Sequence, residues 1–211
     1  MKRILLNNAF PSFPCELIND LSRYGILRSF GCDDLVILEG EQFQNVFIIL
    51  DGSVQLLRTS NEGVEFSLTF LEGPSSVGVT ISDDTPDINK VSHITIRAVE
   101  LTYVLFLPFY YKDQIAKKHD QWYKFILHSA VQFYWIYLDV IDNIAFKKLD
   151  FRLENYILKY AAFKKTNLLH ISHKKVADNL NASRETVSRL LKKMEEMGKI
   201  RLGHNVIEIL K

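Results

Sequence analysis

Cysteine is scarce in this chain of 211 residues, which has only Cys15 and Cys32. Two cysteines are too few for the disulfide framework of a small secreted protein. A single bridge between them is one alternative, and two reduced, partly buried thiols are the favoured one. No apolar run approaches the roughly 18 residues of a membrane span, and the run near the N-terminus is shorter than a signal-peptide core. These absences predict a cytoplasmic protein with no membrane association.

Net charge is also nearly absent, at +1, but this balance hides a strong asymmetry. Residues 1–146 carry 11 Lys and Arg against 18 Asp and Glu, a net charge of −7. Residues 147–211 carry 15 against 7, a net charge of +8. A basic segment joined to a larger acidic part indicates that the C-terminal part meets a polyanion such as nucleic acid. A solvated basic face without a partner is the alternative.

Short segments rich in β-branched and aromatic residues follow one another between residues 34 and 107, after a helical pattern at 14–21. Six of them have the length of a strand: 35–38, 46–50, 54–57, 66–71, 93–97 and 103–107. Turn signals separate them, among them Asp51-Gly52, which favours a tight hairpin. Strands at this spacing predict an antiparallel sandwich or barrel.

Residues 109–146 contain neither Gly nor Pro and predict one long helix. Its apolar residues form two stripes. The first has the alternating spacing of a heptad seam and consists of Leu127, Val131, Tyr134, Leu138, Ile141 and Ala145. The second consists of Trp122, Ile126, Phe133, Ile136 and Val140. A helix of about 50 Å with two apolar stripes is long for one small domain, so we expect one stripe to face a second copy. A plain core helix is the alternative.

The last 65 residues predict helices at 153–163, 174–180 and 184–197, followed by a hairpin of 199–202 with 206–210. The spacing within 172–197 is typical of a helix-turn-helix. Ala177 is small where two helices must cross closely, Asn181 tolerates a left-handed turn, and Ser183 suits an N-cap.

The helix at 184–197 shows two different faces. Its predicted buried face consists of Val187, Leu190 and Met194, and its outward face of Arg184, Glu185, Ser188 and Arg189. Such outward side chains can read base edges, because Arg suits guanine and Glu accepts a hydrogen bond from cytosine. The alternative is an exposed ion pair between Glu185 and Arg189.

The segment Ser183-Arg184-Glu185-Thr186-Val187-Ser188-Arg189 resembles the recognition helix of the Crp–Fnr family of bacterial transcription regulators. Residues 40–41 and 47–54 resemble the opening strands of that family's cyclic-nucleotide-binding fold. The resemblance covers essentially the whole chain. It implies an α+β fold with an N-terminal, jelly-roll-like antiparallel β-roll (1–108), a long dimerisation helix (109–146) and a C-terminal winged helix-turn-helix (147–211).

The same resemblance implies a homodimer that binds an inverted repeat in double-stranded DNA, with RNA polymerase as a further partner and no enzymatic activity. The residues that would read bases are Arg184, Glu185, Ser188 and Arg189. Those that would lie near phosphates are Ser172, His173, Lys174, Ser183 and Thr186.

The effector is expected to be something other than cyclic AMP. Family members that bind cyclic AMP carry a Glu after the glycine of the nucleotide loop, and here Val79 follows Gly78. Their phosphate-binding Arg falls on Ser92 in this chain, and the nearby Lys90 is no bidentate clamp for phosphate. No effector and no cofactor are therefore assigned.

Other cofactors and function classes have weaker support. Two cysteines cannot hold an iron–sulfur cluster unaided, and a haem on His93 or His119 has no supporting motif. The competing function is a small-molecule sensor module whose basic C-terminal domain binds a protein partner. An enzyme ranks third, because no nucleophile–base pairing, metal-ligand spacing or phosphate-binding Gly loop is present.

Overall fold

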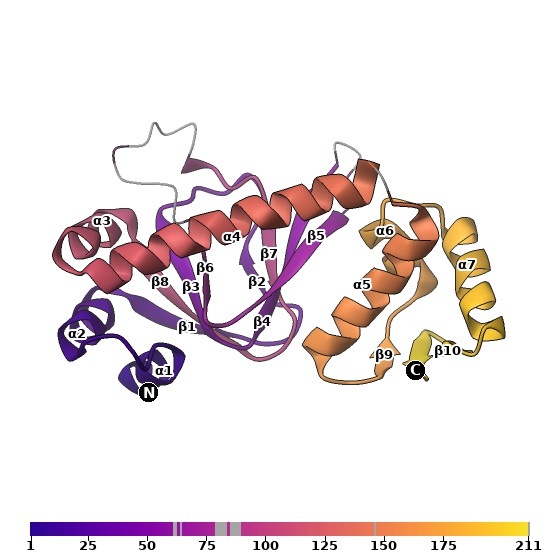
Figure 1. Ribbon diagram of the computed structural model, residues 1–211, viewed down its shortest axis with the longest axis horizontal. Coiled ribbons are helices and arrows are strands. Elements are labelled where there is room, and N and C mark those ends of the chain that lie inside the picture. The colour runs from indigo at the N-terminus through magenta and orange to yellow at the C-terminus, as the bar shows by residue number, and fades with distance from the viewer. Residues whose placement is uncertain (61–62, 64, 79–83, 85–89, 146, 211) are drawn as a thin grey trace. The chain divides into compact units, whose positions relative to one another are not determined.

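The computed structural model describes the whole chain except residues 61–62, 64, 79–83, 85–89, 146 and 211. The chain forms two units, residues 1–56 with 71–138 and residues 57–70 with 139–211. Antiparallel sheets, helices and a C-terminal helix-turn-helix confirm the predicted α+β class (Figure 1).

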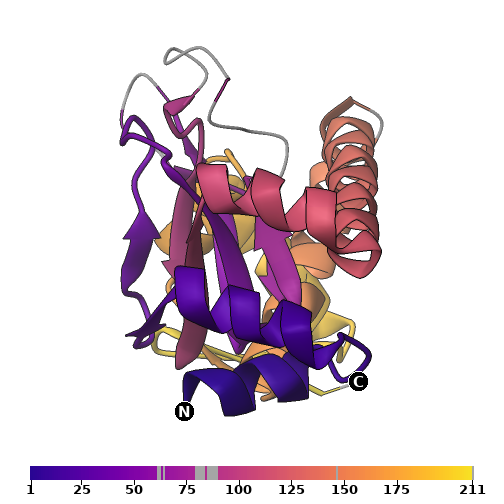
Figure 2. The same cartoon turned by 90° about the vertical axis from the view of Figure 1, so that its left-hand side faces the viewer.

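The strands before residue 109 form two four-stranded sheets, accompanied by three short helices. One sheet has the order β1-β8-β3-β6, and the other has the order β2-β7-β4-β5. The helices α1, α2 and α3 pack beside β3 and β8 (Figure 2). The bounds are α1 Lys2–Ala9, α2 Cys15–Tyr24, β1 Ile26–Phe30, β2 Leu35–Ile37, β3 Asn45–Asp51, β4 Ser53–Thr59, β5 Glu65–Glu72, β6 Ser75–Val77, β7 Thr95–Ala98, β8 Thr102–Pro108 and α3 Phe109–Lys118.

The core of the first unit follows β3 and β8, which pair antiparallel. Every residue from 46 to 50 and from 104 to 107 is buried. The tight hairpin predicted at Asp51-Gly52 is wrong. The chain does turn there, since β3 ends at Asp51 and β4 begins at Ser53, but the two strands belong to different sheets, so the turn leads from one sheet to the other. Gly52 has φ +86°, and a Cβ added to it would lie 2.6 Å from the Leu101 carbonyl oxygen, so the turn requires glycine.

All six predicted strand segments are strands, but two further strands were not predicted. They are β1, which pairs with β8, and β6, which pairs with β3. Both are short, and β1 alternates little in burial, so a periodicity of two is not visible in them. Cys15 and Cys32 are both in the thiol form, as expected, but both are exposed rather than partly buried.

The predicted single helix over 109–146 is wrong in one respect, because the structure has α3 and then α4 (Asp120–Ala145). His119 between them is extended, with φ −130° and ψ 110°. Its Nε2 lies 2.9 Å from the Asp20 carboxylate. Beyond this break, Trp122 is fully buried and its Nε1 donates a hydrogen bond to the Lys112 carbonyl of α3 at 3.1 Å. These two contacts favour two helices over one.

The two apolar stripes of α4 differ in burial. In the second stripe Trp122 is fully buried and Ile126, Phe133 and Ile136 are half-buried. In the heptad stripe Leu127, Val131, Tyr134 and Ile141 are between 46% and 59% exposed, and Leu138 is half-buried. The helix therefore leaves one apolar stripe uncovered within a single chain.

No helix of the described ranges has the length and apolarity to cross a membrane.

The second unit contains the predicted three helices and hairpin. The bounds are α5 Leu149–Lys164, β9 Leu168–His170, α6 His173–Asn179, α7 Arg184–Glu196, β10 Ile200–Gly203 and β11 Val206–Ile209 (Figure 1). The strand β9, which was not predicted, pairs with β11 and extends the hairpin to a sheet of order β10-β11-β9. Residues 57–70, with most of β5, also belong to this unit.

Candidate DNA interface

The turn between α6 and α7 is built as the sequence predicts. Asn181 has φ +49°, in the left-handed region that Asn tolerates better than most residues. The amide of Ala182 donates to the Ala177 carbonyl at 3.0 Å and closes the turn. Ala177 is 1% exposed, which is the close helix crossing that its small side chain permits.

Both helices begin at a serine cap. The Ser183 hydroxyl accepts from the Thr186 amide at 3.2 Å at the start of α7, which confirms the predicted cap. It also lies 2.8 Å from the Thr186 hydroxyl. Ser172 caps α6 in the same way, accepting from the Lys175 amide at 3.2 Å. Each cap stabilises its helix by about 1 kcal/mol and fixes the orientation of the first turn.

The buried face of α7 differs by one residue from the prediction. Val187 and Leu191 are fully buried and Met194 is 9% exposed, whereas Leu190 is only half-buried. Steps of four and three residues from Val187 reach Leu191 and Met194, and this is the face that a straight helix turns inward. The prediction placed Leu190 there in place of its neighbour.

The opposite face of α7 carries Arg184, Glu185 and Arg189, and all three are exposed. Within the described part of the chain, none of these side chains forms a hydrogen bond or an ion pair, so the alternative Glu185–Arg189 pair is not formed. Two guanidinium groups and one carboxylate thus project from the first two turns with their donors and acceptors unused.

Ser188 lies on the same side of α7 but has a partner within the protein. Its hydroxyl is 3.0 Å from Nδ1 of His173, the first residue of α6, and both residues are half-buried. Burial, with a smaller contribution from the charge of Arg184, lowers the pKa of His173 below its ordinary value. The neutral imidazole therefore links the two helices at physiological pH.

The other predicted phosphate contacts lie at the N-terminal ends of α6 and α7. Lys174 is exposed and unpaired among the described residues, whereas Ser172, Ser183 and Thr186 serve in the caps described above. Helix N-termini present unsatisfied amides and a partial positive charge, which suits them to phosphate oxygens. The structure thus brings all nine predicted nucleic-acid residues into the two helices of one motif.

Two interior contacts that the sequence did not reveal hold α6 against α5. Asn179, 2% exposed, donates from Nδ2 to the Tyr156 hydroxyl at 2.7 Å. The Arg152 guanidinium donates to the Leu180 carbonyl at the C-terminal end of α6. A buried asparagine next to a predicted turn was the available signal, since such a residue requires a partner.

The hairpin after α7 is joined to it by a side chain. The carboxylate of Glu195 accepts from the Leu202 amide of β10 at 2.7 Å. Arg201 and Glu208 face each other across the strands at 3.0 Å. The turn residues His204 and Asn205 are exposed, and Asn205 has φ +56°. This hairpin lies beside α7, in the position of a wing.

The residues considered for an effector lie in the first unit. The Ser92 hydroxyl donates to the Ile94 carbonyl at 2.6 Å and is buried, and Val79 lies outside the described residues. Of the two histidines considered for haem, His119 pairs with Asp20 and His93 is exposed. No group of three or more His, Cys, Asp or Glu in the described ranges is placed to share a metal ion.

Comparison with known proteins agrees with this geometry. Residues 152–211 match the model of the Crp-like helix-turn-helix domain. The chain is 26% identical to the cyclic AMP receptor protein of Thermus thermophilus over 178 residues, which is 82% of this chain and 79% of that protein. Its fold is similar to a crp/fnr-family protein of Eubacterium rectale, with a TM-score of 0.79 and 21% identity over 96% of this chain and 93% of that one. It is also similar to the c-di-GMP responsive global regulator CLP of Xanthomonas campestris, with a TM-score of 0.75 and 16% identity over 94% and 100% of the two chains.

A capped helix-turn-helix with an unpaired basic outer face and an adjoining wing defines a DNA-binding protein of the transcription-regulator class. Residues 152–211 thus form a Crp-like helix-turn-helix domain, and the chain as a whole is similar in fold to Crp–Fnr transcription regulators.

Proposed function

We propose that this regulator acts in the cytoplasm as a homodimer that reads an inverted repeat in DNA, contacts RNA polymerase and has no enzymatic activity. Residues 1–108 form the effector domain, 109–146 the dimerisation segment and 147–211 the DNA-binding domain. Arg184, Glu185 and Arg189 contact base edges in the major groove. Lys174 and the cap residues contact phosphates.

The single observation that supports this most strongly is the division of α7 into two faces. Val187 and Leu191 on one side are fully buried. The two arginines and Glu185 on the other side have no hydrogen-bond or ion-pair partner among the described residues. A guanidinium without a protein partner keeps its donors for guanine O6 and N7. Ser188 is a weaker reader than the sequence suggests, because its hydroxyl already bonds His173.

The experiment is selection of bound duplexes from a random pool, followed by binding isotherms at two salt concentrations. We expect an inverted repeat whose half-sites are about one helical turn apart and contain G·C pairs. Arg189→Ala should weaken the selected site by about 1–3 kcal/mol per half-site and leave scrambled DNA nearly unaffected.

Lys174→Ala is the matched control, since Lys174 is exposed, basic and outside α7. It should weaken every duplex similarly and flatten the salt dependence, as expected for a phosphate contact. If Arg189→Ala left the ratio of selected to scrambled affinity unchanged, the assignment of the recognition helix would be wrong. The basic domain would then be better explained as the protein-binding end of a sensor module.

The homodimer is supported by the heptad stripe of α4. Four large apolar side chains at heptad spacing are about half exposed in the single chain, although a soluble helix normally buries such a seam. A second copy of the same stripe covers both seams at once, because a two-fold interface pairs identical surfaces.

The effector is proposed to be other than cyclic AMP. Ser92 stands at the position where the family resemblance places an arginine, and its short hydroxyl is already bonded to the Ile94 carbonyl. A calorimetric titration with cyclic AMP should give weak binding or none. Micromolar affinity would show that a different residue pairs with the cyclic phosphate.

A further inference from the structure

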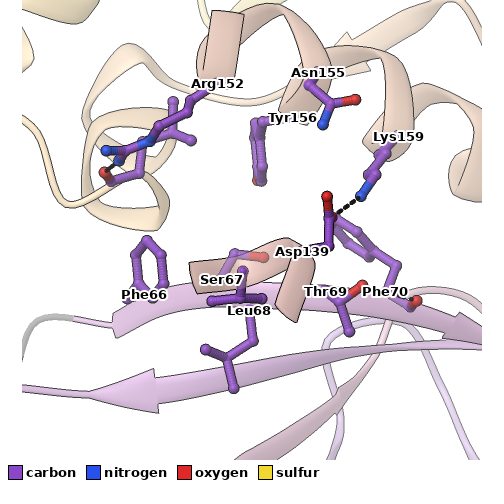
Figure 3. A pocket seen from close by; sticks show the side chains of 12 residues that line it. Phe66, Ser67, Leu68, Thr69, Phe70, Asp139, Arg152, Asn155, Tyr156 and Lys159 are labelled. Carbon is purple, nitrogen blue, oxygen red and sulfur yellow. Dashed lines mark hydrogen bonds and ion pairs between the residues drawn. The ribbon is translucent and has the colours of Figure 1, made fainter. Parts of the chain in front are cut away.

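A groove within the second unit lies between β5 and α5, with a cavity volume of about 70 Å³ and a side open to solvent (Figure 3). Phe66, Ser67 and Thr69 contribute from the strand, and Arg152, Asn155 and Tyr156 from the helix. Figure 3 shows Tyr156 directed from α5 toward the strand and Phe66 directed back toward the helix. The space between them is thus bordered by aromatic rings on two sides.

The charge of this groove is positive. Its charged lining residues are Arg152, Lys159 and Asp139. The Asp139 carboxylate is balanced by Lys159 at 3.4 Å and by Lys147 at 3.7 Å. Arg152 has no carboxylate partner among the described residues, and its only hydrogen bond there is the one donated to the Leu180 carbonyl. A net charge of about +1 therefore remains at the Arg152 end.

The guanidinium of Arg152 is partly removed from water and has no carboxylate partner among the described residues. Arg152 is half-buried, and burial lowers its pKa from the ordinary value for arginine, so its charge is partly removed from water. Buried charges in proteins are paired, since desolvation without a counter-charge is unfavourable. An anion bound in the groove would supply the missing partner through the fork of N–H groups that Arg152 still has free.

The aromatic side of the groove is held rigid. The Tyr156 ring stacks on Tyr160 with centroids 5.9 Å apart, and its hydroxyl is fixed by Asn179. Phe70 packs between this pair and Phe163, which lies 5.0 Å away. A rigid wall favours a planar ligand, because little side-chain freedom is lost on binding.

We propose that the groove between β5 and α5 binds a small planar anion, with an aromatic ring between Phe66 and Tyr156 and its phosphate or carboxylate on Arg152. Leu180 also lines the groove and precedes Asn181 of the turn, so the ligand lies beside the helix-turn-helix. The proposal does not depend on how α7 reads DNA.

The test is a titration of the isotopically labelled full chain, followed in amide NMR spectra. Phenyl phosphate is the probe, with benzoate to distinguish the phosphate from the carboxylate head group. Inorganic phosphate has the anionic group without the aromatic ring, and benzyl alcohol has the ring without the anionic group. We expect phenyl phosphate or benzoate to saturate and to shift amides of 66–70 and 152–159, with both half-probes at least about tenfold weaker.

Two variants and one control complete the experiment. Arg152→Gln should weaken binding at least about tenfold, and Phe66→Leu about threefold or more, because the first removes charge-assisted hydrogen bonds and the second a stacking ring. Lys192→Gln removes an exposed charge from α7 outside the groove and should have no effect. Phe66→Leu decides the question if Arg152→Gln destabilises the fold.

Three results would overturn the proposal. Inorganic phosphate that binds as tightly as phenyl phosphate would leave only an unspecific anion surface. Shifts confined to α6 and α7 would place the probe on the surface proposed for DNA. Unchanged affinity in a folded Arg152→Gln or Phe66→Leu variant would show that the groove takes no such ligand.

Discussion

The heptad stripe of α4 permits a sharp test of dimerisation. Val131 is 46% exposed in the single chain, so Val131→Glu should leave the fold of the chain intact. Leu138 is half-buried, and a charge there would disturb the chain itself as well as an interface. Val131 is therefore the better position for separating folding from association.

The magnitude follows from the two-fold symmetry of the proposed dimer. Val131 is 46% exposed in the single chain, so each subunit loses about half of a valine's full burial, roughly 0.7 kcal/mol, and both subunits change at once. The loss from burial is about 1.4 kcal/mol, which weakens the dimer roughly tenfold, and desolvation of the two new carboxylates weakens it further. Like charges close to the two-fold axis add to this effect.

Sedimentation velocity over a range of protein concentrations measures the change. Gln132→Glu is the matched control, since Gln132 is the exposed neighbour outside the stripe and the substitution introduces the same charge. We expect Gln132→Glu to keep the wild-type dissociation constant and Val131→Glu to sediment as a monomer at micromolar concentration. Equal dissociation constants for the two variants would refute the assignment of α4 as the seam.

Three further predictions concern stability. Tyr156→Phe should lower the free energy of unfolding by about 1–3 kcal/mol in urea titrations, because it leaves the buried Asn179 amide without its partner, and Asn179 Oδ1 already has none in the described structure. Gly52→Ala should cost about 2 kcal/mol or more, because φ is +86° and the new Cβ meets a backbone oxygen at 2.6 Å. Gly40→Ala, with φ +90° and no atom within 4 Å, should cost less in the same titration. The pKa of His173 is lower in the folded chain than in the unfolded one, so on acidification the unfolded chain binds a proton more readily. The thermal stability should therefore fall as the pH drops below about 6.5, the ordinary pKa of histidine. The variant His173→Gln should show a weaker dependence of thermal stability on pH.

The helix-turn-helix could be predicted closely because its signals are local. The caps at Ser172 and Ser183 and the left-handed Asn181 each act within a few residues of the chain. Only the inward residue of one helical turn was misjudged, since Leu190 and Leu191 have the same chemistry and periodicity alone separates them poorly.

What the sequence did not reveal depends on contacts between distant segments. His119 leaves the helix where it meets Asp20, 99 residues away in the chain. A start signal was nevertheless present, because Asp120 follows two lysines and suits the first turn of a new helix. The groove at Arg152 needs β5 beside α5, which no local pattern predicts, so this arginine without a carboxylate partner was not recognised as a candidate.

Base contacts by α7 and dimerisation through α4 both raise the affinity for the inverted repeat, but only the base contacts act on an isolated half-site. Binding to the two kinds of DNA therefore distinguishes the two proposed surfaces. A monomer meets a single half-site with the contacts of one α7, whereas a dimer adds the second helix at a high effective concentration. Val131→Glu should therefore lose affinity for the inverted repeat while keeping that of the wild-type monomer for an isolated half-site. Arg189→Ala should lose affinity for both the inverted repeat and the isolated half-site, because every half-site contact uses an Arg189 guanidinium that the variant lacks. A Val131→Glu protein that bound the full repeat as tightly as the wild type would mean that the recognition helices act independently of the α4 seam.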